Sequence, residues 1–90
     1  MSMLKIVDVK HLENYELQLV FNDETIVIVD LKNELDGPIF APLRELNYFQ
    51  SVSLDADTGT ISWSNGADFA PEFLKELGKD SKVYQEAPAL

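Results

Sequence analysis

The chain contains no cysteine and a single histidine, His11, among its 90 residues. Without cysteine, disulfide bonds, thiolate catalysis and zinc or iron–sulfur centres with cysteine ligands are excluded. One histidine also excludes a histidine-rich metal cluster, and no positioned carboxylate or nucleophile marks it as a general base. We therefore expect no catalytic residue, no cofactor and no metal ligand, and interpret His11 as a surface residue at a strand end.

Basic residues are also few: 7 lysines and arginines stand against 16 aspartates and glutamates, for a formal net charge of -9. Clustered lysine and arginine, which nucleic-acid phosphates attract, are missing. The charge would repel anionic membranes and complement a basic protein. No apolar stretch approaches the ~18 residues of a membrane span, and the N-terminus lacks a signal-peptide pattern. We expect a cytoplasmic protein with a basic protein partner and without nucleic-acid or membrane binding.

What the sequence does contain is enough apolar content for one core, since 46% of the residues are hydrophobic. A chain of this length can build only one such core. We expect a single domain over residues 1–78. The remaining residues, 79–90, are mostly polar and end in Ala-Pro-Ala-Leu, so we expect a flexible C-terminal tail there.

The first half of the domain has the pattern of three strands. Residues 4–10 are rich in β-branched side chains, and residues 15–21 alternate between apolar and polar ones, as in a strand with one buried face. Turn-forming residues at 22–24 and an apolar run over 25–31 then predict a hairpin. Within that run Ile26–Val29 is apolar on both faces. Either the strand is covered on both sides, or one face awaits a second subunit in a homodimer.

The second half predicts two short helices around another hairpin. Residues 33–38 are typical of a capped turn, and Pro42 is expected to begin a helix that buries Leu43, Leu46 and Phe49 on one face. Residues 52–63 predict a hairpin, and Pro71 a second helix that reaches about residue 77 and stops at Gly78. The expected fold is therefore α+β: a small antiparallel sheet of two hairpins plus an N-terminal strand, with two short helices against it.

Acidic residues provide the few candidates for chemistry. Asp55 and Asp57 have the spacing of calcium ligands, but Gly59 occupies the fifth position, where an EF-hand needs an oxygen ligand, so we interpret this loop as a hairpin turn. Asp30 interrupts an apolar strand, while Asp68 and Glu72 flank a turn and a helix start. The last two are expected to be structural, near unpaired N–H groups of the helix.

Three stretches carry a resemblance to a known family: YELQLVFNDE at 15–24 with VDL at 29–31, GPIFAPL at 37–43, and ISWSNGADFAPEFL at 61–74. Over residues 4–77 the chain resembles the bacterial domain-of-unknown-function family numbered 2442, described from the N-terminal domain of a two-domain regulator-like protein. Two positions depart from the family pattern. Glu24 stands where the family usually has glycine, so a looser or different hairpin turn is expected, and Ser64 stands where it tends to have proline.

The resemblance implies a small α+β domain of unassigned activity. Some members carry a helix-turn-helix domain after it, and others are encoded beside small toxin-like proteins, which suggests toxin–antitoxin pairing. A role of this chain on DNA is therefore expected to need a partner.

Three functional hypotheses follow from these patterns. The first is a protein-interaction module, antitoxin-like or regulatory, whose surface contains Trp63, Asn65, Gly66, Asp68 and Glu72. Trp63 itself is open to two interpretations, as a core residue or as an interface residue. The second hypothesis is a ligand-binding protein or enzyme that uses Asp30, Asp68 or Glu72 in a cleft beside Trp63. The third is a scaffold that forms homodimers through Ile26–Val29.

Overall fold

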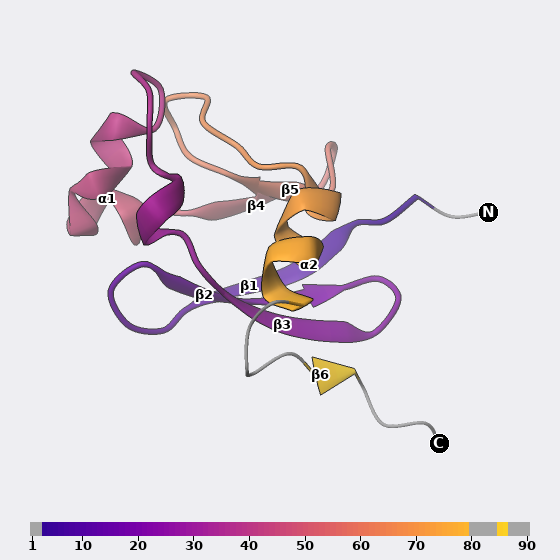
Figure 1. Cartoon of the computed structure of the whole chain (residues 1–90). Helices are drawn as coiled ribbons and strands as arrows, with labels where there is room; N and C mark the ends of the chain where they lie inside the picture. Colours follow the sequence, from indigo (N-terminus) through magenta and orange to yellow (C-terminus); the bar gives the residue numbers. More distant parts are fainter. Residues whose placement is uncertain (1–2, 80–84, 87–90) are drawn as a thin grey trace.

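The structure is a computed structural model that describes residues 3–79 and 85–86 of the chain (Figure 1). Its main antiparallel sheet has the strand order β1-β2-β3-β6. These strands are β1 (Ile6–His11), β2 (Glu16–Phe21), β3 (Thr25–Asp30) and β6 (Gln85–Glu86). A second sheet consists of β4 (Ser53–Asp55) and β5 (Thr60–Ser62). With helices packed beside both sheets, the predicted α+β class is confirmed.

The hairpin of β2 and β3 forms as the alternating sequence predicts. Leu17 lies opposite Val29 and Leu19 opposite Val27, and all four side chains are buried. Since successive strand residues point to opposite faces, the residues between them point outward. The apolar run of β3 therefore divides: Val27 and Val29 enter the core, while Ile26 and Ile28 lie half-buried on the outer face.

The helix expected from Pro42 is present as two separate turns. These are the 3-10 helix η2 (Ala41–Arg44) and the α-helix α1 (Leu46–Phe49). Another 3-10 helix, η1 (Lys32–Glu34), precedes both in the chain. Glu45 separates η2 from α1 because its backbone is extended, with φ -75° and ψ 115°. The predicted face is nevertheless correct, since Leu43 and Phe49 are buried and Leu46 packs against the core.

The second hairpin forms a separate sheet. The sequence predicts a single sheet of both hairpins, but the second hairpin does not extend the main sheet. β4 pairs with β5, and the backbone N–H of Ile6 donates a 2.7 Å hydrogen bond to Gly59 O at the hairpin turn. Ile61 on β5 is fully buried. The hairpin thus lies over the main sheet and closes the core between them.

The second helix, α2 (Pro71–Lys79), is longer than predicted and contains Gly78. The prediction that Gly78 ends the helix is therefore wrong. A Cβ atom at this position would lie 2.5 Å from the Cβ of Val27. Glycine is thus needed for the close approach of α2 to β3, and not for a left-handed helix end.

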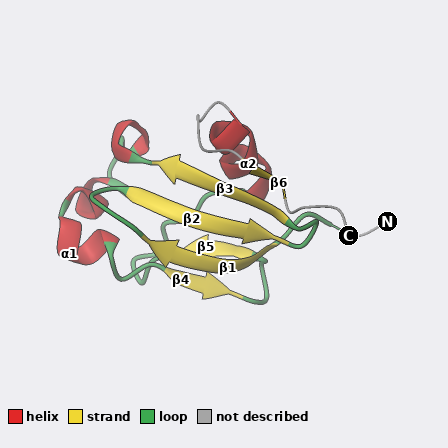
Figure 2. Ribbon diagram, turned by 90° about the horizontal axis from the view of Figure 1, so that it is seen from below, coloured by secondary structure: helices red, strands yellow, loops and turns green. Residues whose placement is uncertain are grey.

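All described helices and the second hairpin lie on one side of β1, β2 and β3 (Figure 1). Figure 2 shows the other face of this sheet, with no helix of the described chain across it. None of the described helices is long and apolar enough to cross a membrane. Of the expected tail, Lys79 ends α2 and Gln85–Glu86 pairs with Thr25 and Ile26; its other residues lie outside the described ones.

Candidate functional site

Trp63 lies in the core, where only 3% of its surface is exposed. Its indole N–H donates a 2.9 Å hydrogen bond to the carbonyl of Phe49. Its ring also lies 5.7 Å from that of Phe49 and 6.0 Å from that of Phe69. Of the two interpretations of Trp63, the structure agrees with the one as a core residue. The Trp63 side chain therefore supports the neighbouring surface from below and is not part of it.

Asn65 and Gly66 form the turn that the sequence predicts. The Gly66 N–H donates to Trp63 O at 3.0 Å, and Gly66 has a φ of +91°, which favours glycine. The Asn65 side chain is bonded on both sides: its Oδ1 accepts from the Ala67 N–H, and its Nδ2 donates to Ile39 O at 2.9 Å. Asn65 therefore fixes the loop at residues 37–41 beside this turn.

Asp68 and Glu72 both carry exposed side chains. The backbone of Asp68 forms an isolated bridge with Ser62, and Glu72 lies in the first turn of α2. Glu72 thus has the expected place near the positive end of the helix. For the side chain of Asp68, no hydrogen-bond partner is found among the described residues. Of the five predicted interaction residues, these two have exposed charged side chains.

An exposed apolar surface adjoins these acids. The rings of Phe40 and Phe69 stack at 4.8 Å, and those of Phe69 and Phe73 stack at 5.8 Å, so three aromatic rings form a column. Its inner member, Phe69, is buried, whereas Phe73 is 41% exposed and neighbouring Ile39 is 44% exposed. We call the side chains of Ile39, Phe40 and Phe73 the Phe73 patch.

Acidic side chains border the Phe73 patch along α2. Residues three and four apart share a helix face, so Glu76 lies one turn beyond Glu72 and next to Phe73. Both glutamates are exposed. The buried side of the helix is formed instead by Leu74 and Gly78. The outward face of α2 therefore combines an aromatic ring with two negative charges.

The members of the Phe73 patch were not among the predicted interaction residues. The sequence does contain a signal for Phe73: if Leu74 and Gly78 face the core, position 73 turns away from it by helical periodicity. For Ile39 and Phe40 no comparable signal exists, because their place depends on the long-range bond from Asn65.

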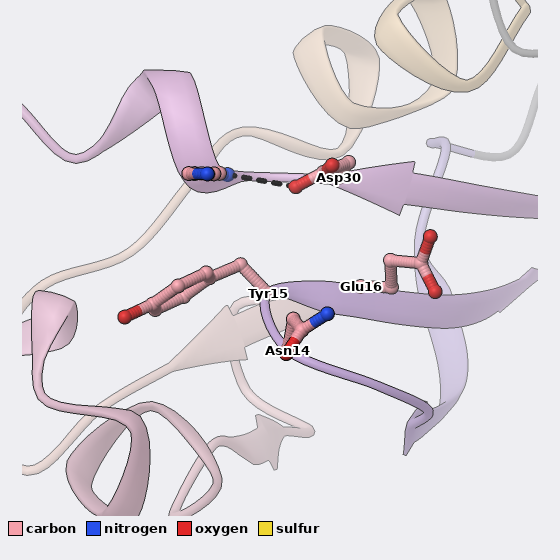
Figure 3. A pocket seen from close by; sticks show the side chains of 5 residues that line it. Asn14, Tyr15, Glu16 and Asp30 are labelled. Carbon is pink, nitrogen blue, oxygen red and sulfur yellow. Dashed lines mark hydrogen bonds between the residues drawn. The ribbon is translucent and has the colours of Figure 1, made fainter.

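A separate polar groove of about 310 Å³ lies at one end of the main sheet, lined by Asn14, Tyr15, Glu16, Asp30 and Lys32 (Figure 3). Glu16 lies opposite Asp30 in the β2–β3 register. The Tyr15 side chain points away from both acids, and its hydroxyl donates to Arg44 O. Oδ1 of Asp30 accepts the backbone N–H of Lys32 at 3.0 Å.

The acids of the enzyme hypothesis are not brought together by this groove. Asp30 lines it, but Asp68, Glu72 and the buried Trp63 do not. Asp30 instead stabilises the exit of β3 through its bond to Lys32. The hypothesis of a shared cleft therefore has no support from the positions of these residues.

The remaining candidate residues have structural partners. Oδ1 of Asp55 accepts the backbone N–H groups of Asp57 and Thr58, which makes the predicted hairpin turn. Nε2–H of His11, at the end of β1, donates to Asn14 O at 2.8 Å. Over the described part of the chain, no group of three or more metal-ligating side chains occurs.

Comparison with known families assigns the chain to one of them. A family described as Protein of unknown function (DUF2442) matches residues 6–80, which is most of the chain. The chain belongs to this family, and its α+β fold of two antiparallel sheets is therefore that of a DUF2442 member. No curated protein and no solved structure matches the chain.

Proposed function

We propose that this DUF2442 domain is a cytoplasmic protein-interaction module that binds a basic protein through the Phe73 patch and its acidic border. The observation that carries the proposal is the exposed ring of Phe73 on α2, next in sequence to the exposed Glu72 and one turn before the exposed Glu76. Aromatic side chains often dominate binding energy at interfaces, and surrounding charges select the partner and speed its association.

The site is held rigidly from beneath, as a binding surface requires. Phe73 rests on Phe69, which contacts the ring of Trp63, and Trp63 is bonded to the backbone of α1. In this proposal the Asn-Gly-Ala-Asp segment at residues 65–68 has mainly a structural role. It positions the loop of Ile39 and the start of α2, and only part of it touches the partner.

A basic partner also suits the chain as a whole, which carries a formal charge of -9. An antitoxin-like or regulatory component would use such a surface to hold a basic protein, and any effect on nucleic acid would pass through that protein. The proposal needs no catalytic residue.

Co-purification of the full chain from its native host, followed by mass spectrometry, tests this function. A basic protein should be recovered with the wild type and largely lost with Phe73→Ser or with Glu72→Gln combined with Glu76→Gln. The charge-matched control is Glu13→Gln combined with Glu45→Gln, two exposed acids outside the patch, which should retain it. Recovery of the chain alone at monomer mass, or equal recovery with every variant, would contradict the proposal.

A second candidate function is a homodimerising scaffold, which the outer face of the main sheet favours. Ile26 and Ile28 lie there beside Val20, and all three are half-buried, with no described helix over them. Sedimentation over a range of concentrations tests this role. A dimer that Ile28→Lys dissociates would support it, and a monomer at every concentration would end it.

A further inference from the structure

The Phe73 patch is formed by a helix and a loop, and this restricts what can bind it. A partner strand binds by adding its backbone to a free sheet edge. The patch has no such edge, because it contains no strand and several backbone groups of its loop are already bonded. Ile39 O accepts from Asn65, and the N–H groups of Phe40 and Ala41 both donate to Gly37 O.

The helical side of the patch offers no sheet edge either, because Phe73 lies within α2. α2 covers Pro71–Lys79, and the N–H of Leu74 donates to Ala70 O at 3.1 Å, as in a regular first turn. A partner cannot add a strand here, so we expect it to bind through side chains. An α-helix is suited to this because its own backbone groups are satisfied internally.

The charges on α2 indicate which side chains such a helix needs. Glu72 and Glu76 are one turn apart, so their carboxylates present negative charge at the spacing of successive helix turns. Lysine or arginine at positions i and i+4 of a partner helix would match both. An apolar residue on the same partner helix would then cover the ring of Phe73.

A second copy of this chain is a poor occupant. Two Phe73 patches brought face to face would also bring Glu72 and Glu76 of one copy against those of the other. Like charges in contact oppose association. The nearest basic residue on the helix, Lys75, is engaged by Asp23.

We infer that the partner of the Phe73 patch is an amphipathic α-helix with basic residues one turn apart beside an apolar stripe. This rests on the proposed function and names the structural class of its partner. The helix would lie along α2, with its cations on Glu72 and Glu76 and its apolar stripe across Phe73 towards Ile39.

Two synthetic peptides of the same leucine and lysine composition distinguish this geometry. One has the leucines at helical spacing over about 15 residues, which is long enough for a helix. The other alternates leucine and lysine, a pattern that forms strands. Binding to the full chain is followed by NMR chemical-shift changes. The helical peptide should shift the amides of Ile39, Asp68 and Phe73, and it should bind at least fivefold more tightly than the alternating peptide.

The variants test whether the patch causes the binding. Phe73→Ser and, separately, Ile39→Ser should each weaken the helical peptide at least fivefold, as should Glu72→Gln with Glu76→Gln. Glu13→Gln with Glu45→Gln should leave it unchanged. Equal binding of both peptides, or shifts centred on Ile26 and Ile28, would overturn the inference. If the native partner still depends on Phe73 while the helical peptide does not bind, the inference fails and the proposed function stands.

Discussion

Some single residues in this domain have backbone conformations or contacts whose effect on stability can be tested by one substitution. Among the residues that the structure describes, two other than glycine have positive φ: Asn14 at 50° and Glu24 at 71°. Asparagine tolerates this region, but glutamate has no such advantage. Glu24 ends the turn between β2 and β3, where its N–H donates to Phe21 O at 3.0 Å. Glu24 therefore has a backbone conformation that suits glycine better than a residue with a side chain.

Replacing Glu24 with glycine should stabilise the protein. The left-handed backbone costs a residue with a side chain roughly 1–2 kcal/mol, and glycine loses part of that gain through extra entropy in the unfolded chain. We expect a net gain of about 0.5–1 kcal/mol in the free energy of unfolding, measured by urea titration. The fluorescence of Trp63, the only tryptophan, would report the transition.

Glu45→Gly is the matched control for that experiment. Glu45 is also an exposed glutamate between two elements, but its φ is -75°, so glycine relieves no strain there. This variant should be unchanged or less stable. If both variants were equally stabilised, or if Glu24→Gly lost stability, backbone strain at position 24 would not be the cause.

Elements whose structure depends on the local sequence pattern could be predicted. Features that depend on contacts between distant parts of the chain could not. The alternation at 15–21 predicts β2 and its buried face, because that pattern depends only on neighbouring residues. The length of α2 could not be predicted, because Gly78 is usually a helix stop. The reason for a glycine inside this helix becomes clear only from the close contact between Gly78 and Val27. In the same way, the Phe73 patch depends on the contact of Asn65 with a loop 26 residues earlier.

Gly78→Ala tests that contact between α2 and β3. In an exposed helix, alanine would add about 1 kcal/mol of stability. Here its Cβ would lie 2.5 Å from Val27 Cβ and within 3.0 Å of both methyl groups, and such overlap typically costs about 1–3 kcal/mol. We expect a net loss, measured by chemical denaturation. The loss should be smaller in a Val27→Ala background, which removes both methyl groups.

Glu76→Ala supplies the comparison within the same helix. Glu76 is exposed, so this change alters helix propensity without overlap, and its effect should be close to zero. A Gly78→Ala variant as stable as the wild type would show that α2 can move away from β3 at little cost.

The ion pair of Asp23 and Lys75 joins the β2–β3 turn to α2 and should make stability depend on acid pH. The hydrogen bond from Lys75, aided by those from Thr25, lowers the pKa of Asp23 from 3.8 to about 2. Because the folded pKa is the lower one, the stabilisation is complete above pH 3.8 and lost as the pH falls towards 2. Since Asp23 is 41% exposed, we expect less than about 1 kcal/mol.

The measurement is the free energy of unfolding of the wild type and of Asp23→Asn from neutral pH down to the acid range. The difference between them should be constant above about pH 4 and shrink below it. Lys75→Met should remove the same increment, and the double variant should lose little more. A difference that grows as the pH falls would have the wrong sign for this ion pair.

For the whole molecule, two properties would determine how the proposed partner binds: a formal charge of -9 and an exposed apolar patch. They act at different ranges. The charge would attract the proposed basic partner over about one Debye length, roughly 10 Å at 0.1 M salt. The patch acts only in contact, through burial of apolar area. Salt should therefore weaken the first effect and leave the second nearly intact.

We accordingly expect the affinity for the helical leucine–lysine peptide to fall several-fold when salt is raised from about 50 mM to about 500 mM, because exposed charges are then screened. Glu72→Gln with Glu76→Gln should flatten this dependence, since it removes the charges nearest the peptide. Phe73→Ser should instead lower the affinity at every salt concentration and keep the slope. Isothermal titration calorimetry of the three proteins measures both quantities. Equal slopes for the wild type and the glutamine variant would show that the attraction comes from the net charge of the chain and not from the acids on α2.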